Sequence, residues 1–141
     1  MTAPAQTRFN KVLLVDGDLR TSQRLAKLLR EDGFDVEVVR DGATAIARLT
    51  RAPLPDILIT ELKLPLCDGS AVVRFGRSQH AGLSVVVLTG YPNLLAPEAF
   101  GSPAPVVLTK PLDYPALLDV LNRHDFSGHD RTASSPARRS A

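Results

Sequence analysis

The chain has 141 residues, 44% of which are hydrophobic, and a formal net charge of +2 at pH 7. These values predict one globular domain with a single hydrophobic core. They argue against a membrane span or a membrane partner, because no apolar run approaches the roughly 18–20 residues that a span needs, and the first residues lack the hydrophobic centre of a signal peptide. The single cysteine, Cys67, excludes a disulfide framework, so we expect a cytoplasmic protein.

The excess of positive charge lies at the two ends of the sequence. Four of the 17 lysines and arginines and one of the 15 acids lie outside residues 11–125, which leaves that stretch with a net charge of −1. We therefore expect no nucleic-acid partner for it. Residues 126–141 are rich in Ser, Ala and Arg and have no helical or strand period. The sequence thus predicts disordered tails at 1–10 and 126–141 around a domain at 11–125.

Five short apolar runs predict five β-strands, at 11–16, 35–40, 56–61, 84–89 and 105–109. Four of the runs are apolar on successive residues, which is typical of strands that are covered on both faces. The run at 35–40 alternates more, so we expect it at an edge of the sheet.

Amphipathic segments separate the runs and predict helices. Their apolar stripes, spaced i, i+3, i+4, are Leu25, Leu28 and Leu29, then Ala43, Ile46 and Ala47, and finally Leu117, Val120 and Leu121. Asp18, Asp41 and Asp113 stand where helix N-caps are expected, and Gly33 stands where the first helix ends. Strands that alternate with helices predict an α/β fold, a parallel sheet with helices on both faces.

The connection between the fourth and fifth strands is the exception. It contains Pro92, Pro97, Pro103 and Pro105, and a proline inside a helix costs about 3 kcal/mol. We expect one or two helical turns there, starting at Pro97, and an irregular approach to the last strand.

Chemically active residues follow the predicted strands. Asp16, Gly17 and Asp18 follow the first strand, Glu61 ends the third, Thr89 ends the fourth, and Lys110 and Pro111 follow the fifth. In a doubly wound sheet, ligands bind beyond the carboxyl ends of the strands. Each residue alone has an ordinary explanation: Asp18 caps a helix, Thr89 satisfies a turn and Lys110 is a surface charge. Their coincidence at four strand ends favours a functional site.

The motifs VLLVDGD (12–18), PDILITELKLPLCDG (55–69), VVVLTGY (85–91) and LTKP (108–111) resemble the CheY-like receiver domain of bacterial two-component response regulators. The resemblance covers roughly 11–125. It implies a flavodoxin-like five-stranded parallel sheet of order 2-1-3-4-5, with a short or irregular fourth helix and a cis Lys110–Pro111 peptide.

The resemblance also implies a chemistry. In that family an aspartate at the end of the third strand accepts a phosphoryl group from a histidine kinase. Magnesium is held by that aspartate, by an acid of the pair after the first strand, and by a backbone carbonyl that would here belong to Lys63. Asp16, Pro65, Gly69, Thr89, Lys110 and Pro111 match the family pattern.

Three positions depart from it. Gly17 replaces the second acid of the pair, Glu61 replaces the phosphoacceptor, and Val107 replaces the switch aromatic. Gly17 removes a metal ligand from an ion that is usually held by one or two carboxylates. The extra methylene of Glu61 displaces its oxygens by about 1 Å, and such a displacement costs on the order of a hundredfold in rate. Because phosphoryl transfer depends on positioning and cations, we expect no catalytic residue, no bound metal and no cofactor.

The pocket residues remain charged. We expect Glu61 to reach toward Thr89 and Lys110, with Lys110 within ion-pair distance, and so to imitate in part a phosphorylated aspartate. Lys63 either folds back onto Asp16 and Glu61, where magnesium would lie, or is a solvated loop lysine; both alternatives stay open.

We interpret the chain as a degenerate, stand-alone receiver of the two-component or phosphorelay type that acts by protein–protein interaction. The resemblance places the partner, a histidine kinase or a downstream signalling protein, on the face of the fourth helix, the fifth strand and the last helix, at about 113–123. The resemblance does not decide whether the chain also forms a homodimer.

Two alternatives stay open. One is a working single-domain response regulator, phosphorylated with Mg²⁺ held by Asp16, Glu61 and the Lys63 carbonyl. The other is a haloacid-dehalogenase-like phosphohydrolase, with Asp16 as nucleophile and Asp18 as acid. The second lacks the further acidic pair that such enzymes carry beyond the lysine, and the chain is short for that fold.

Overall fold

Strands and helices alternate along residues 11–123, which are the residues that the computed structural model describes. The strands are β1 (Lys11–Val15), β2 (Asp35–Val39), β3 (Ile57–Glu61), β4 (Ser84–Thr89) and β5 (Val106–Thr109). The α-helices are α1 (Leu19–Glu31), α2 (Gly42–Leu49), α3 (Gly69–Gln79) and α4 (Tyr114–Arg123). Two 3₁₀ helices, η2 (Pro92–Leu94) and η3 (Pro97–Phe100), lie between β4 and β5. The predicted tails at 1–10 and 126–141 lie outside the described residues.

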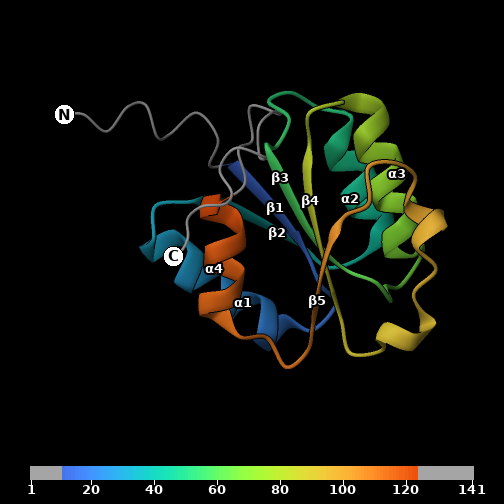
Figure 1. Cartoon of the computed structure of the whole chain (residues 1–141). Coiled ribbons are helices and arrows are strands. Elements are labelled where there is room, and N and C mark those ends of the chain that lie inside the picture. Colours follow the sequence, from blue (N-terminus) through green and yellow to red (C-terminus); the bar gives the residue numbers. More distant parts are fainter. Residues whose placement is uncertain (1–10, 124–141) are drawn as a thin grey trace.

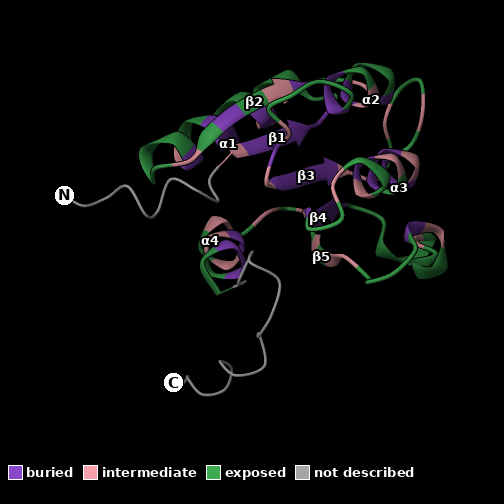
Figure 2. Cartoon of the chain, turned by 90° about the horizontal axis from the view of Figure 1, so that it is seen from above, coloured by how far each residue is buried: buried purple, intermediate pink, exposed green. Residues whose placement is uncertain are grey.

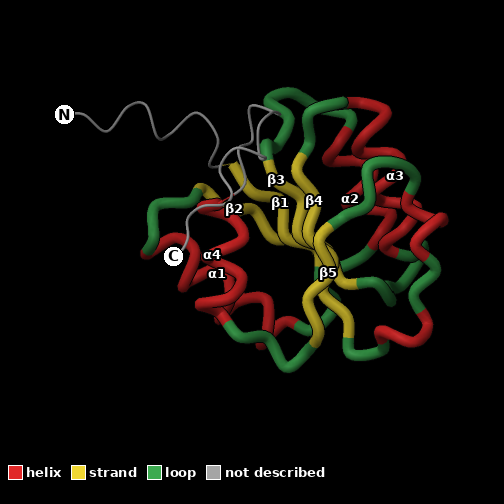
Figure 3. Tube along the Cα trace, viewed as in Figure 1, coloured by secondary structure: helices red, strands yellow, loops and turns green. Residues whose placement is uncertain are grey.

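The five strands form one parallel sheet of order β2-β1-β3-β4-β5 (Figures 1 and 3). This order and the edge position of β2 confirm the expectations from the sequence. In register, Leu14 of β1 lies opposite Val38 of β2 and Ile59 of β3. All parallel strands end at the same edge, so the segments that follow β1, β3, β4 and β5 meet there.

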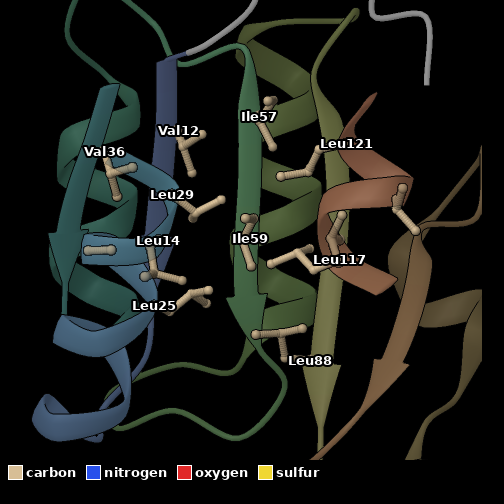
Figure 4. Packing of buried hydrophobic residues seen from close by; sticks show 13 residues of the cluster. Val12, Leu14, Leu25, Leu29, Val36, Ile57, Ile59, Leu88, Leu117 and Leu121 are labelled. Carbon is tan, nitrogen blue, oxygen red and sulfur yellow. The ribbon is translucent and has the colours of Figure 1, made fainter. Parts of the chain in front are cut away.

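Two apolar layers fill the space between the sheet and its helices. The helices α1 and α4 cover one face, and α2 and α3 cover the other (Figures 1 and 2). The layer under α1 and α4 contains Val12, Leu14, Ile57, Ile59, Leu25, Leu29, Leu117 and Leu121 (Figure 4). The opposite layer contains Leu13, Val15, Leu58, Val87, Ala45, Leu49, Val72 and Val73. Successive residues of the inner strands serve opposite faces, which explains why their sequences are apolar throughout.

Aspartates begin three of the helices. Asp18 accepts a hydrogen bond from the Thr21 N–H, and Asp41 accepts one from the Thr44 N–H, so both predicted caps are confirmed. Asp68 caps α3 in the same way, which the sequence analysis did not predict. Asp113 directly precedes α4, and its carbonyl accepts from the Leu117 N–H. Each such cap satisfies an N–H group that the helix itself leaves unpaired.

Helix α2 is rotated relative to the predicted stripe. Ala45 and Leu49 are buried, whereas Ala43 and Ala47 are exposed, so the stripe that placed these two alanines inside is wrong. A side chain at Gly42 would collide with the Cys67 thiol and carbonyl. The β3–α3 loop lies close to Gly42, at the start of the rotated helix. This contact joins residues that are distant in the sequence, so the local pattern of α2 does not predict it.

The β4–β5 connection packs against α3. Its two 3₁₀ helices begin at Pro92 and Pro97, so the expectation of short turns with one start at Pro97 is confirmed. Phe100 is 1% exposed and belongs to the layer between the sheet and α2 and α3. The Arg74 and Arg77 side chains of α3 donate to the carbonyls of Ala99 (2.7 Å) and Phe100 (3.1 Å).

Strand β5 is therefore covered less than predicted. Its residues alternate between intermediate and exposed (Figure 2). Val107 is 36% exposed. Val107 lies opposite Val87, a residue of the layer under α2 and α3. The expectation that this strand is covered on both faces is wrong, since β5 is an edge strand of the sheet and the connection that precedes it packs against α3.

Candidate functional site

Most of the predicted strand-end residues line one cleft, whereas Thr89 and Pro111 do not. It has a volume of about 670 Å³ and lies at the carboxyl edge of the sheet, the lower edge in Figure 1. Its walls are formed by Asp16, Gly17, Asp18, Glu61, Lys63, Pro65, Gly90, Tyr91 and Lys110. These residues come from the segments that follow β1, β3, β4 and β5, as the sheet topology requires.

Lys110 joins the two carboxylates of the cleft. Its Nζ lies 3.3 Å from Asp16 Oδ2 and forms a second ion pair with Glu61 Oε1. The exposed fraction is 3% for the Asp16 side chain, 12% for Glu61 and 26% for Lys110. The expected ion pair between Lys110 and Glu61 is confirmed, and a pair with Asp16 accompanies it.

The remaining carboxylate oxygens accept from backbone N–H groups. Asp16 Oδ1 accepts from the Asp18 N–H at 2.9 Å, and Glu61 Oε2 accepts from the Leu62 N–H at 3.2 Å. Each of the four oxygens thus has a donor. Buried carboxylates are stable when they are paired and hydrogen-bonded in this manner.

The pKa of Lys110 lies above its ordinary value of 10.5. Burial lowers this pKa, but the hydrogen bond to Glu61 and the charges of Asp16 and Glu61 together raise it by more. A raised pKa in the folded protein means that the ion pairs stabilise the fold at pH values below 10.5. Their contribution is lost only as the pH rises through the raised value.

Thr89 and Pro111 fix the neighbouring chain. Thr89 is fully buried, and its Oγ1 accepts from the Tyr91 N–H at 2.9 Å, so its hydroxyl serves the turn after β4. The Lys110 N–H donates to the Thr89 carbonyl at 2.8 Å, and the Lys110–Pro111 peptide is cis, as the resemblance implied. The backbone on both sides of the Lys110 side chain is thereby held.

Neither Gly17 nor Asp18 offers the cleft a side chain that is free to bind a ligand. A Cβ atom at Gly17 would lie 3.5 Å from the Arg40 carbonyl and from Pro65 Cδ, which is ordinary van der Waals contact. The Asp18 carboxylate accepts from the Thr21 N–H (3.2 Å) and Oγ1 (2.9 Å), and these bonds, the backbone one first, lower its pKa. Asp18 is therefore committed to the cap of α1, as expected.

Lys63 lines the cleft without an ion pair among residues 11–123. It is exposed, which agrees with the alternative of a solvated loop lysine. Lys110 occupies the place between Asp16 and Glu61 that the other alternative gave to Lys63.

Sequence reasoning missed a second, smaller cleft beside the first. It has a volume of about 340 Å³ and is lined by Leu62, Lys63, Asp68, Ser70, Leu94, Ala96, Ala99 and Phe100. The Ser70 hydroxyl donates to Asp68 at 2.6 Å, and a side chain at Gly69 would collide with the Glu61 carbonyl. Asp68 was the available signal for the start of α3, since aspartate is a favoured N-cap residue.

Several large apolar side chains are exposed, and two of them line the clefts. Among the described residues, Tyr91 is 60% exposed and Leu94 59%, and Val107 of β5 is also exposed. Tyr91 lines the larger cleft and Leu94 the smaller. In the part of the chain that the structure describes, no helix has the length and apolarity needed to cross a membrane.

Comparisons with known proteins agree with this arrangement. Residues 12–122 match the family described as the response regulator receiver domain. A response regulator receiver protein of Anaeromyxobacter sp. (strain Fw109-5), Anae109_2439, is 33% identical over 115 residues, which are 79% of this chain and 47% of the relative. The DNA-binding response regulator MtrA of Mycobacterium tuberculosis is 35% identical over 83 residues, 59% of this chain and 36% of MtrA. This chain thus spans less than half the length of these relatives.

Solved structures show the same fold. The chemotaxis response regulator CheY4 of Vibrio cholerae superposes with a TM-score of 0.71 at 29% identity, over 82% of this chain and 98% of CheY4. The signal receiver domain of an HD domain-containing protein from Pseudomonas fluorescens Pf-5 gives a TM-score of 0.73 at 28% identity, over 82% of this chain and 94% of that one.

Proposed function

Because this chain belongs to the response regulator receiver domain family, we propose that it is a two-component signalling module that acts by binding another protein and is not phosphorylated at Glu61. Glu61 ends β3, the position that the family's acceptor aspartate occupies. The observation that carries the proposal is the binding of both Glu61 oxygens, one to Lys110 and one to the Leu62 N–H.

The Glu61 carboxylate is a poor acceptor for two reasons. It carries one more methylene than aspartate, and attack on phosphorus depends on the position of the nucleophile to within about 1 Å. It also lies largely buried in an ion pair with Lys110, which shares its single positive charge between Glu61 and Asp16. The carboxylate can imitate a phosphorylated aspartate only in part, because it has one charge and two oxygens whereas a phosphate has about −1.5 to −2 charge and three oxygens.

The donors of the cleft do not fit a magnesium ion. Magnesium takes oxygen ligands in near-octahedral geometry and keeps several waters. The cleft offers Asp16 and Glu61, both paired with Lys110, and Gly17 contributes no side chain. The donor set therefore supports a receiver that works without the metal-assisted phosphoryl transfer of its family.

The phosphohydrolase alternative loses its support. It needs Asp18 as an acid, whereas Asp18 caps α1. It also needs an acidic pair at a strand end beyond Lys110, and residues 114–123 form the helix α4.

We propose that the partner, a histidine kinase or a downstream signalling protein, binds the face formed by η2, η3, β5 and α4. Exposed apolar side chains that occur close together are typical of protein interfaces. Three large ones are exposed here: Tyr91 directly precedes η2, Leu94 belongs to η2 and Val107 belongs to β5. A second copy of the chain is the other occupant of this face that binding measurements would detect.

Incubation with acetyl phosphate and magnesium, followed by intact-mass measurement, tests the proposal. The mass of the protein stays unchanged if the proposal is right, and a gain of one phosphoryl group overturns it.

A further inference from the structure

The smaller cleft lies between the β3–α3 loop with the start of α3 on one side and the β4–β5 connection on the other. The first side supplies Leu62, Lys63, Asp68 and Ser70, and the second supplies Leu94, Ala96, Ala99 and Phe100. The volume of about 340 Å³ lies at the lower end of the range for small-molecule sites, about 300–1,000 Å³. The cleft is therefore large enough for a small ligand.

Hydrogen bonds hold both walls of this cleft in place. The Gly69 N–H donates to the Leu62 carbonyl at 2.8 Å, which ties the β3–α3 loop to the first turn of α3. On the other side, Arg74 of α3 donates to the Ala99 carbonyl at 2.7 Å, and the buried Phe100 ring anchors the connection. A site with walls that are already in place binds a ligand at a lower entropic cost.

Two opposite charges in the walls have unused binding capacity. The Lys63 ammonium has no ion pair among residues 11–123. Asp68 accepts from the Ser70 hydroxyl (2.6 Å) and from the Ala71 N–H (3.1 Å), and both bonds reach its Oδ1 atom. The Ser70 bond first, and the Ala71 bond with it, lower the pKa of Asp68, so the carboxylate is ionised at neutral pH. Its Oδ2 atom is left to accept from a ligand.

The remaining walls of the cleft are apolar. Their side chains are those of Leu62, Leu94, Ala96, Ala99 and Phe100. Leu94 is largely exposed, so a ligand that covers it removes apolar surface from water and gains free energy. A complementary molecule carries a carboxylate for Lys63, an ammonium for Asp68 and a short apolar body. An apolar α-amino acid has these three groups.

We infer that the smaller cleft binds a free apolar α-amino acid. The carboxylate of the ligand pairs with Lys63, its ammonium pairs with the Asp68 carboxylate, and its side chain lies against the apolar walls. Hydrogen bonds between charged groups of this kind are stronger than those between neutral groups. The ligand adds to the proposed function without depending on it. Its binding is measured on the protein alone, so a negative result leaves the phosphorylation test and the partner face unaffected.

Titration of the wild-type protein with L-valine, L-leucine and L-phenylalanine, followed by amide NMR, tests the inference. At least one of the three shifts the signals of Leu62, Lys63 and Ala99, and the shift saturates at millimolar concentrations. The absence of a saturable shift with all three amino acids overturns the inference. A shift confined to the signals of Asp16 and Lys110 places the ligand in the larger cleft and also overturns it.

Analogues of the amino acid that binds best test the three contacts one at a time. For L-leucine, isocaproate lacks the ammonium, isoamylamine lacks the carboxylate, and glycine lacks the apolar side chain. Each analogue binds at least tenfold more weakly, because it leaves one group of the cleft without its partner. An analogue that binds as tightly as the amino acid overturns the inference.

Two variants identify the charged groups of the cleft. Lys63→Met removes the ammonium, and Asp68→Asn removes the negative charge while it keeps a side-chain acceptor for the cap of α3. Each lowers the affinity at least tenfold. Lys27→Met is the matched control, because Lys27 is exposed on α1 and does not line the cleft, and it leaves the affinity unchanged.

Full affinity in Lys63→Met or in Asp68→Asn, or an equal loss in Lys27→Met, overturns the inference. The analogue titrations use the wild-type protein and decide the matter if a variant does not fold.

Discussion

Val107 of β5 lies directly opposite Val87 of β4, yet Val87 is fully buried and Val107 is 36% exposed. Paired residues of parallel neighbouring strands point to the same face of the sheet, so both valines face the side of α2 and α3. The difference in exposure arises because the β4–β5 connection packs on α3 and leaves β5 uncovered. An apolar strand face is thereby available to a partner.

The first prediction concerns this face. Val107→Asp places a charge on the proposed interface, and we expect it to weaken binding of the partner at least tenfold, since a buried unpaired charge costs several kcal/mol at about 1.4 kcal/mol per factor of ten. Asp119→Lys on α4, the part of the proposed interface on the other side of the sheet, should also weaken binding. A two-hybrid assay against histidine kinases and response-regulator output proteins, followed by titration calorimetry with the partner found, measures the effect.

Arg51→Glu is the control for that experiment. Arg51 is exposed after α2, away from β5, and its substitution should leave binding unchanged. Partner binding that tolerates Val107→Asp and Asp119→Lys but requires Glu61 would show that the partner reads the cleft instead of this face.

Phe100 provides the second prediction. It is 1% exposed and anchors the β4–β5 connection to the layer under α3. Phe100→Ala should lower the free energy of unfolding by about 3–5 kcal/mol, because it removes a buried ring and leaves a cavity. Leu94→Ala, at a residue that is 59% exposed, should change it by less than about 1 kcal/mol. Urea denaturation compares the two, and equal effects would contradict the anchoring role of Phe100.

The third prediction concerns Asp68, the cap of α3. Asp68→Ala should lower the free energy of unfolding by about 1 kcal/mol at neutral pH, because the Ala71 N–H loses its acceptor. The hydrogen bond from the Ser70 hydroxyl, more than any other contact, lowers the pKa of Asp68 below its ordinary 3.8. A lowered pKa in the folded state stabilises the fold above pH 3.8, and this contribution is lost as the pH falls through the lowered value.

Unfolding measured from neutral pH downward checks this dependence. The difference between wild type and Asp68→Ala should be constant at neutral pH and shrink below pH 3.8. Asp68→Asn, which keeps a side-chain acceptor for the cap, should lose much less stability than Asp68→Ala. A difference that grows toward acidic pH would show that the carboxylate does not stabilise α3.

Much of the fold could be predicted from local patterns. The strand order, the caps by Asp18 and Asp41 and the short turns at Pro97 follow from hydrophobic periodicity, cap chemistry and the resemblance to receivers. The exposure of β5 could not, because it depends on where Phe100 docks in three dimensions. The rotation of α2 likewise depends on the contact between Gly42 and Cys67, which lie far apart in the sequence.

The sequence predicted which residues form the candidate site, but it did not predict all of the ion pairs between them. Strand ends alone placed Asp16, Glu61 and Lys110 at one edge of the sheet. The bridging of both carboxylates by a single ammonium depends on how far the Lys110 side chain reaches from β5 past β4 to β3 and β1, which the sequence does not specify. The same applies to Lys63, whose two alternatives are distinguished only by the position that Lys110 takes.

Intact-mass measurement after incubation with acetyl phosphate and magnesium shows whether Gly17 and Glu61 block phosphorylation, when the wild-type protein is compared with the double variant Gly17→Asp, Glu61→Asp. The cleft has room for an aspartate Cβ at position 17, 3.5 Å from its nearest neighbours, and Thr89 and Lys110 are already at their strand ends. Our account predicts that the double variant gains one phosphoryl group and the wild type gains none. Either single change should restore less, because metal ligand and nucleophile act as a unit. A wild-type protein that gains the phosphoryl group would contradict the account.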